Sequence, residues 1–290
     1  MATTGTDTVD QVVEKYREAA EANRRTAGRR GSLIELAPAD ADEVLISADL
    51  HGNRLNFRQL QRIADLDSHP GRHVVVQEVL HGGPTYPSGH GCMSHLLLED
   101  IALWKLRHPQ RMHFLLGNHE LSELTDFPIT KGGRILNLQL RAGMQEQYGA
   151  AAEVVREAAM AFLASCPLAL RLANGIFVCH AVPANVDTQG FDVDVFRRPL
   201  RPSDLAAGGD VFRLLWGRDF RDENATAFAA LVGADILIQG HEPCAHGYWV
   251  PNPHQIVLDC CGRHACYLLL STGERISHRQ IVQRIRPLHH

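Results

Sequence analysis

Short apolar runs alternate with stretches of helical spacing through the first half of the chain. A capping pattern at Thr8 and Gln11 opens a run of apolar residues at helical spacing, which predicts a helix that ends near Arg25. The apolar runs predict four strands, at residues 32–36, 43–48, 73–76 and 112–116. An amphipathic stretch at residues 57–64 and a leucine-rich stretch at residues 93–106 predict helices between them. This alternation favours a βαβ build.

The second half of the chain combines longer helical stretches with further short strands. Residues 136–166 are predicted to be helical, as is a shorter stretch at 225–232. Strands are predicted at residues 168–172, 176–179, 236–238, 255–258 and 265–270. Residues 183–210 show little periodicity, so we expect a long surface loop or lid there. We expect a helical lead-in over residues 1–30 and a single domain over residues 31–290.

Composition and charge exclude several classes of protein. A chain of 290 residues that is 45% apolar can bury a full core. Its net charge of −4 provides no basic field, so neither a nucleic-acid polymer nor a membrane is expected as a partner. No apolar run approaches a membrane span, and the start lacks the pattern of a signal peptide. We therefore expect a cytoplasmic protein whose seven cysteines are reduced thiols.

Polar side chains follow the predicted strands at the points where the strands end. These residues are Asp49, His51, Glu78, His81, Asn118, His119, His180 and His241. Burying such groups beside a strand end is costly unless a cation compensates, and the mixture of carboxylate, imidazole and amide suits manganese, iron or zinc. The set is large enough for two divalent or trivalent ions, with manganese the expected metal in vitro.

Five short motifs occur in an order that resembles a known family. Asp49-Leu50-His51-Gly52 and Gly117-Asn118-His119-Glu120 match the D-x-H-G and G-N-H-E patterns of the calcineurin-like metallophosphoesterases. Cys179-His180-Ala181, Leu214-Leu215-Trp216 and Gly240-His241-Glu242 resemble later motifs of the phosphoprotein-phosphatase branch of that family. The resemblance covers roughly residues 12–272.

The resemblance implies a fold, a reaction and a role for each motif residue. The fold would be an α/β four-layer sandwich, with two mixed β-sheets packed face to face and flanked by helices. The reaction would be hydrolysis of a phosphoester by a dinuclear metal centre, with a phosphorylated protein or a small phosphoester as substrate. The resemblance assigns one metal to Asp49, His51 and Glu78, and the other to Glu78, Asn118, His180 and His241. His119 would be the general acid, and Asn118 would also contact the substrate.

The segment from Glu78 to Gly82 departs from the family pattern G-D-x-x-D-R-G. Glu78 takes the place of the bridging aspartate, and His81 replaces the carboxylate that supports the catalytic histidine. Gly82 replaces an arginine that grips phosphate, so we expect Arg218, Arg221 and Arg263 to supply positive charge for the substrate. Two other functions stay open: hydrolysis of dinucleoside polyphosphates, and a metal-binding pseudo-phosphatase with little activity.

Overall fold

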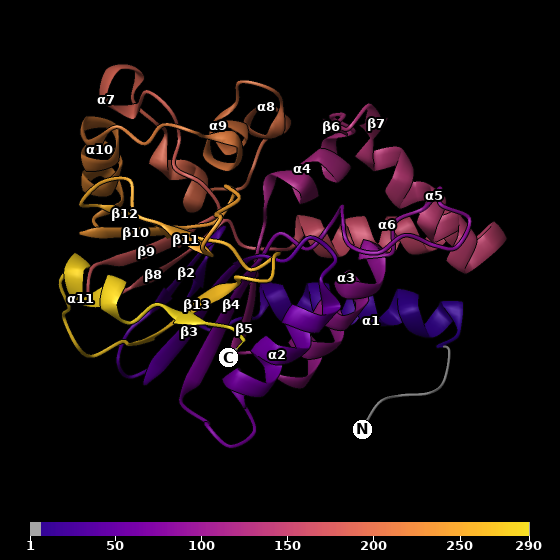
Figure 1. Cartoon of the computed structure of the whole chain (residues 1–290), viewed down its shortest axis with the longest axis horizontal. Helices are drawn as coiled ribbons and strands as arrows, with labels where there is room; N and C mark the ends of the chain where they lie inside the picture. Colours follow the sequence, from indigo (N-terminus) through magenta and orange to yellow (C-terminus); the bar gives the residue numbers. More distant parts are fainter. Residues whose placement is uncertain (1–6, 290) are drawn as a thin grey trace.

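Two β-sheets packed face to face form the centre of the computed structural model, which describes residues 7–289 (Figure 1). The larger sheet has seven strands in the order β1 (Arg29–Arg30), β2 (Leu33–Leu36), β8 (Ala169–Leu172), β9 (Ile176–Cys179), β10 (Ile236–Gln239), β12 (Gln255–Leu258) and β11 (Tyr248–Trp249). The other has five, in the order β14 (Arg286–Pro287), β13 (Cys266–Ser271), β3 (Glu43–Asp49), β4 (Arg72–Gln77) and β5 (Met112–Leu115). A hairpin of β6 (Thr130–Lys131) and β7 (Arg134–Ile135) stands apart from both.

Helices gather in two groups on either side of the sheets (Figure 1). One group consists of α1 (Val9–Arg24), α2 (Arg54–Ala64), α3 (Ser94–Arg107), α4 (Asn118–Thr125), α5 (Leu136–Tyr148) and α6 (Ala152–Ala164). The other consists of α7 (Val186–Gln189), α8 (Pro202–Leu205), α9 (Asp210–Trp216) and α10 (Asp222–Val232), and α11 (His278–Gln283) lies near the carboxyl end of the chain. The predicted α/β architecture, with two mixed sheets flanked by helices, is confirmed.

Aliphatic side chains fill the space between the two sheets. Ile46 and Val75 of the smaller sheet pack in one cluster with Val178 and Ile238 of the larger sheet, and all four are fully buried. These strands read as continuous apolar runs because both of their faces are covered. Within the smaller sheet β3, β4 and β5 are parallel, and within the larger sheet β9, β10 and β12 are parallel. The carboxyl ends of each set therefore lie along one edge.

The helical prediction matched the longer helices and was wrong where helices are short or interrupted. The capping box of α1 is present, with the Thr8 hydroxyl accepting from the Gln11 backbone N–H at 3.3 Å. The predicted helix at 136–166 is divided at Gly149, where φ is positive. The predicted loop at 183–210 contains α7, a 3₁₀ turn at Val193–Phe196 and α8. Residues 1–6 of the expected lead-in lie outside the described part of the chain.

Two expectations from composition can be compared with the structure. The seven cysteines are free thiols, as expected. Across residues 7–289, the structure contains no helix with both the length and the apolar character that a membrane crossing requires.

Candidate metal centre

Five strand ends deliver polar side chains to a common edge of the two sheets. Asp49 is the last residue of β3, Glu78 follows β4 directly, and Asn118 is the first residue of α4, just after β5. His180 follows β9, and His241 comes shortly after β10. The edge beyond the carboxyl ends of parallel strands is where open α/β sheets bind ligands. The sequence pattern of apolar run followed by polar residue therefore corresponds to one place in the fold.

Several residues at this edge have a left-handed backbone. The φ angles are +42° at His51, +37° at Glu78, +60° at His81 and +73° at His241. Non-glycine residues in sparsely populated regions of φ/ψ space cost on the order of 1–3 kcal/mol each and cluster at functional sites. Their concentration here supports the assignment of this edge as the functional site.

Four side chains from four segments converge on one point: Glu78, Asn118, His180 and His241. The Nε2 atom of His180 lies 2.6 Å from Glu78 Oε2, 2.9 Å from Asn118 Oδ1 and 3.1 Å from His241 Nδ1. Asn118 Oδ1 also lies 2.9 Å from His241 Nδ1. All four side chains are buried. They are the residues expected to hold the second metal, and the structure brings them together.

The lone pairs in this group of four suit a cation. The amide oxygen of Asn118 faces only acceptor atoms, and turning the amide over would let its nitrogen donate to Glu78 at 3.2 Å and to both imidazoles at 2.9 Å. In the observed orientation, carboxylate, amide and imidazole all direct electron pairs to the same small volume. Such a mixed set of oxygen and nitrogen donors fits manganese, iron or zinc.

A second group of donors shares Glu78 with the first. Nitrogen atoms of His51 and His119 and a carboxylate oxygen of Glu78 lie within 4.8 Å of one another. The Nε2 atom of His119 is 3.3 Å from Glu78 Oε1, and Nε2 of His180 is 2.6 Å from Glu78 Oε2. Glu78 therefore belongs to both groups of donors.

Asp49 lies beside these groups rather than within them. Both of its carboxylate oxygens accept from the backbone N–H of His241 at 3.0 Å, and Oδ1 lies 3.8 Å from Nδ1 of His180. Among residues 7–289, Asp49 belongs to neither group of clustered donors. His119 lies beside His51 and Glu78, and Asp49 is close enough to both of them for their charges to shift its pKa.

Burial and crowding shift the ionisation of the donors. Burial raises the pKa of Asp49 to about 6, and the charge of Glu78 adds to this effect. Burial also opposes ionisation of Glu78, but His180 and His119 outweigh it and hold the pKa of Glu78 well below its usual range. Against the effect of burial, Glu78 raises the pKa of His180 to about 9. A bound cation would take the place of the proton that His180 otherwise carries, because ligating imidazole is neutral.

His119 is more open than His180, with 15% of its side chain exposed against 0% for His180. Its Nδ1 atom lies 3.0 Å from Nδ1 of His81, so the structure places the two predicted catalytic histidines side by side. Burial lowers the pKa of His119 to about 3, despite the attraction of Glu78, so this ring is neutral at pH 7.

Two glutamates of α4 complete the site, and neither was assigned a role from the sequence. The Glu120 carboxylate accepts from the backbone N–H groups of Val79 and Leu80 at 2.9 Å and from that of Gly117 at 3.1 Å. Glu123 Oε1 lies 2.8 Å from Nε2 of His81. Glu123 follows His119 by four residues, a spacing that would have indicated a shared helix face had α4 been predicted.

Of the three arginines expected to bind substrate, only Arg218 has an ion-pair partner, Glu242, that adjoins a residue of the donor groups, His241. The half-exposed side chain of Arg218 forms an ion pair with Glu242 at 2.6 Å. Burial holds the pKa of His241 well below its usual range, and the charge of Arg218 lowers it further. Arg221 is held by Asp187 at 2.9 Å and Asp219 at 2.6 Å. Arg263 contacts His264. Within the described chain, neither Arg221 nor Arg263 forms a hydrogen bond or an ion pair with the clustered donors.

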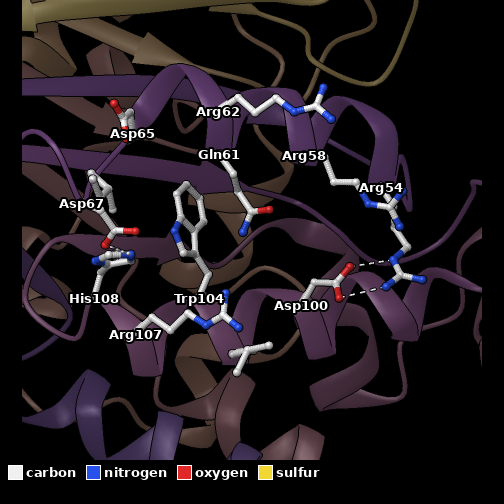
Figure 2. Close-up of a pocket in the computed structure, with 12 residues that line it drawn as sticks. Arg54, Arg58, Gln61, Arg62, Asp65, Asp67, Asp100, Trp104, Arg107 and His108 are labelled. Atoms are coloured by element: carbon white, nitrogen blue, oxygen red, sulfur yellow. Dashed lines mark hydrogen bonds and ion pairs between the residues drawn. The ribbon is translucent and has the colours of Figure 1, made fainter. Parts of the chain in front are cut away.

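A large cavity lies elsewhere, between α2 and α3 (Figure 2). Its volume is about 1020 Å³, and its walls include the paired Arg54 and Asp100 together with Trp104 and Arg107. None of the predicted site residues lines it. The candidate centre is thus a site at the sheet edge and not the floor of this cavity.

Several solved structures with a similar architecture are phosphatases. A protein serine/threonine phosphatase from Saccharomyces cerevisiae, with similarity to human phosphatase PP5, superposes with a TM-score of 0.64 and 15% identity, over 91% of this chain and 82% of that chain. The chain has the fold of a phosphatase. A cold-active protein tyrosine phosphatase gives 0.55 and 13%, over 87% and 78% of the two chains. The cold-active protein tyrosine phosphatase of a psychrophilic Shewanella species gives 0.55 and 14%, over 88% and 80%.

These likenesses concern the fold. No protein-family model matches the sequence, and no curated protein matches it either. Membership of the calcineurin-like family therefore stays a prediction from the motifs.

Proposed function

We propose that this protein is a metal-dependent phosphoester hydrolase of the serine/threonine protein phosphatase type. Its substrate would be a phosphomonoester, carried by a phosphorylated protein or by a small molecule. The observation that carries the proposal is the convergence of Glu78, Asn118, His180 and His241 from four separate segments. The phosphatase fold supports it.

Two ions are proposed, because Glu78 belongs to both groups of donors. Asn118, His180 and His241 would hold one ion, and His51 would hold the other with Glu78. Bound there, the ions would lower the pKa of a water and neutralise charge that develops on a phosphoryl oxygen. Asp49 is proposed to complete the set by a small shift from the backbone of His241.

His119 is proposed to donate a proton to the leaving oxygen from Nε2. Its ring is neutral in the resting protein, because burial lowers its pKa to about 3. A phosphate dianion beside the ring would raise this pKa, since opposite charges favour the protonated form. Arg218 is proposed to bind the substrate phosphate, with Asn118 contributing from its place between the imidazoles.

The experiment combines metal analysis with hydrolysis of p-nitrophenyl phosphate in manganese. We expect Asp49→Asn and His241→Ala to abolish turnover and to lower the bound metal. His69→Ala, which removes an exposed imidazole elsewhere, is the matched control and should change neither. Full activity in both site variants would remove the proposal. Loss of turnover in His119→Ala with its metal content retained would assign the ring to proton transfer; loss of metal would make it a ligand.

Two rival functions are separated by the choice of substrate. Faster hydrolysis of a dinucleoside tetraphosphate than of a phosphopeptide would favour a phosphoanhydride hydrolase. The altered segment from Glu78 to Gly82 favours a pseudo-phosphatase. Two tightly bound ions without turnover of any phosphoester would establish that alternative.

A further inference from the structure

We propose that Glu123 is a positioning residue for His119 and acts on it through His81. The inference rests on the proposed function, in which His119 donates the proton to the leaving group. The three side chains form a continuous chain of hydrogen bonds. Glu123 Oε1 lies 2.8 Å from His81 Nε2, and His81 Nδ1 lies 3.0 Å from His119 Nδ1. Glu123 thus supplies, through His81, the carboxylate that the family motif has at the position of His81.

The chemistry of the three groups fixes where the protons lie. An ionised carboxylate only accepts, so Nε2 of His81 carries a hydrogen and donates it to Glu123. The two Nδ1 atoms then share one proton, because neither two bare nitrogens nor two N–H groups can form a hydrogen bond. Both rings are held in orientation, and Nε2 of His119 is directed to the side of the site where Glu78 lies.

Burial makes this chain of bonds stronger than an exposed one. The side chains of His81 and Glu123 are both fully inaccessible, so water does not compete for their hydrogen bonds. The low polarity of such surroundings strengthens each bond, and a bond to a charged acceptor polarises the ring between. Glu123 therefore makes Nδ1 of His81 a better acceptor for the N–H of His119.

The surroundings of Glu123 argue that it serves more than helix stability. Its second oxygen, Oε2, is buried without a hydrogen-bond partner among the described residues, so His81 is the one group that its carboxylate contacts by a hydrogen bond. A buried charge with so little compensation is costly to keep. His81 is held as firmly, because its backbone N–H donates to the Ser94 hydroxyl at 3.0 Å.

The first experiment measures kcat, KM and metal content for Glu123→Gln, which keeps the shape and removes the charge. We expect kcat to fall about 10–100-fold, less than the roughly 10²–10⁴-fold that general acid catalysis contributes in full, because His119 itself stays in place; KM and metal content should be unchanged. The control is Glu99→Gln, since Glu99 lies 3.5 Å from a histidine, His95, outside the site and accepts a hydrogen bond from the Tyr148 hydroxyl. It should leave kcat unchanged.

A double variant tests the route through His81. His81→Asp combined with Glu123→Gln places a carboxylate beside His119 and an amide donor behind it. We expect this variant to recover most of the kcat that Glu123→Gln loses. A kcat within twofold of the parent in Glu123→Gln, a parallel loss of metal, or no recovery in the double variant would each overturn the inference.

A measurement that needs no turnover separates this inference from the proposed function. In the zinc-loaded protein, ¹⁵N NMR of the imidazoles should show Nε2 of His81 protonated, with its proton resonance moving upfield in Glu123→Gln. An unprotonated Nε2 would overturn the positioning role. If the parent protein hydrolyses no phosphoester while this signature is present, the proposed function fails and the Glu123–His81 contact still stands.

Discussion

Replacing Glu120 by alanine should destabilise the protein more than any ordinary surface change. The Glu120 carboxylate is fully buried and accepts from three backbone N–H groups, those of Val79, Leu80 and Gly117. These bonds fasten the segment that follows β4 to the start of α4, and each segment carries proposed metal ligands. In Glu120→Ala all three N–H groups lose their acceptor.

The expected cost follows from the number of bonds lost. A buried donor left without a partner costs about 1–3 kcal/mol, so three cost about 3–9 kcal/mol. We expect a value near the lower end, about 3–5 kcal/mol, because truncation leaves room for water. Since domains are stable by about 5–15 kcal/mol, this change approaches the whole margin.

Glu120→Gln should fall between the parent and Glu120→Ala. Its oxygen can still accept from Val79 and Leu80, while its amide nitrogen meets the N–H of Gly117 as donor against donor. One lost bond costs about 1–3 kcal/mol. Glu153→Ala is the control, because Glu153 is 63% exposed and its pair with Arg156 contributes less than about 1 kcal/mol.

Urea denaturation followed by circular dichroism measures these differences, with a chelator present so that metal binding does not contribute. The expected order of stability is parent, Glu120→Gln, Glu120→Ala, with the control close to the parent. A loss below about 1 kcal/mol in Glu120→Ala, or equal losses in both variants, would refute the role assigned to the three hydrogen bonds.

Two further predictions concern a glycine and a buried lysine. A Cβ atom at Gly240 would lie 2.2 Å from Asp49 Oδ1, so Gly240→Ala must displace that carboxylate. Metal analysis of this variant should show less bound metal. An unchanged metal content would contradict the proposed role of Asp49 as a ligand. Burial lowers the pKa of Lys105 to about 7 from 10.5, so this group binds more protons in the unfolded chain between these values. Its contribution to stability should rise with pH, on the order of 2 kcal/mol from pH 7 to 9, while His180, whose pKa is raised to about 9, contributes in the opposite direction. In Lys105→Met the urea midpoint should lose this rise, and an identical pH dependence in both proteins would exclude it.

Local patterns predicted most of the fold because its strands are short and apolar on both faces. The runs around Ile46, Val75 and Val178 lie within predicted strands, and the core between the sheets contains these residues. The helix at Asn118 was missed because it is only eight residues long and its first turn consists of motif residues. Segments such as α7 and α8, of four residues each, are too short to show helical spacing.

The candidate site was predicted as a set of residues, but not as a set of contacts. Asp49 accepts from the backbone of His241, which lies 192 positions away, and no local pattern encodes such a bond. Glu123 contacts His81 across 42 positions, so its role appears only once α4 is placed against the segment after β4. The pairing of Arg221 with Asp187, 34 positions away, is equally non-local, and it engages a side chain that was expected to bind substrate.

The left-handed backbone at His51, Glu78 and His241 restricts how this site can diverge. Besides glycine, asparagine, aspartate and histidine enter that region far more readily than other residues, and β-branched side chains hardly at all. Substitutions at these three positions therefore favour side chains with oxygen or imidazole donors over those with thiolates. A shift in metal preference would have to begin at Asp49, Asn118 or His180, whose φ angles are negative, or come from the supply of ions in the cell.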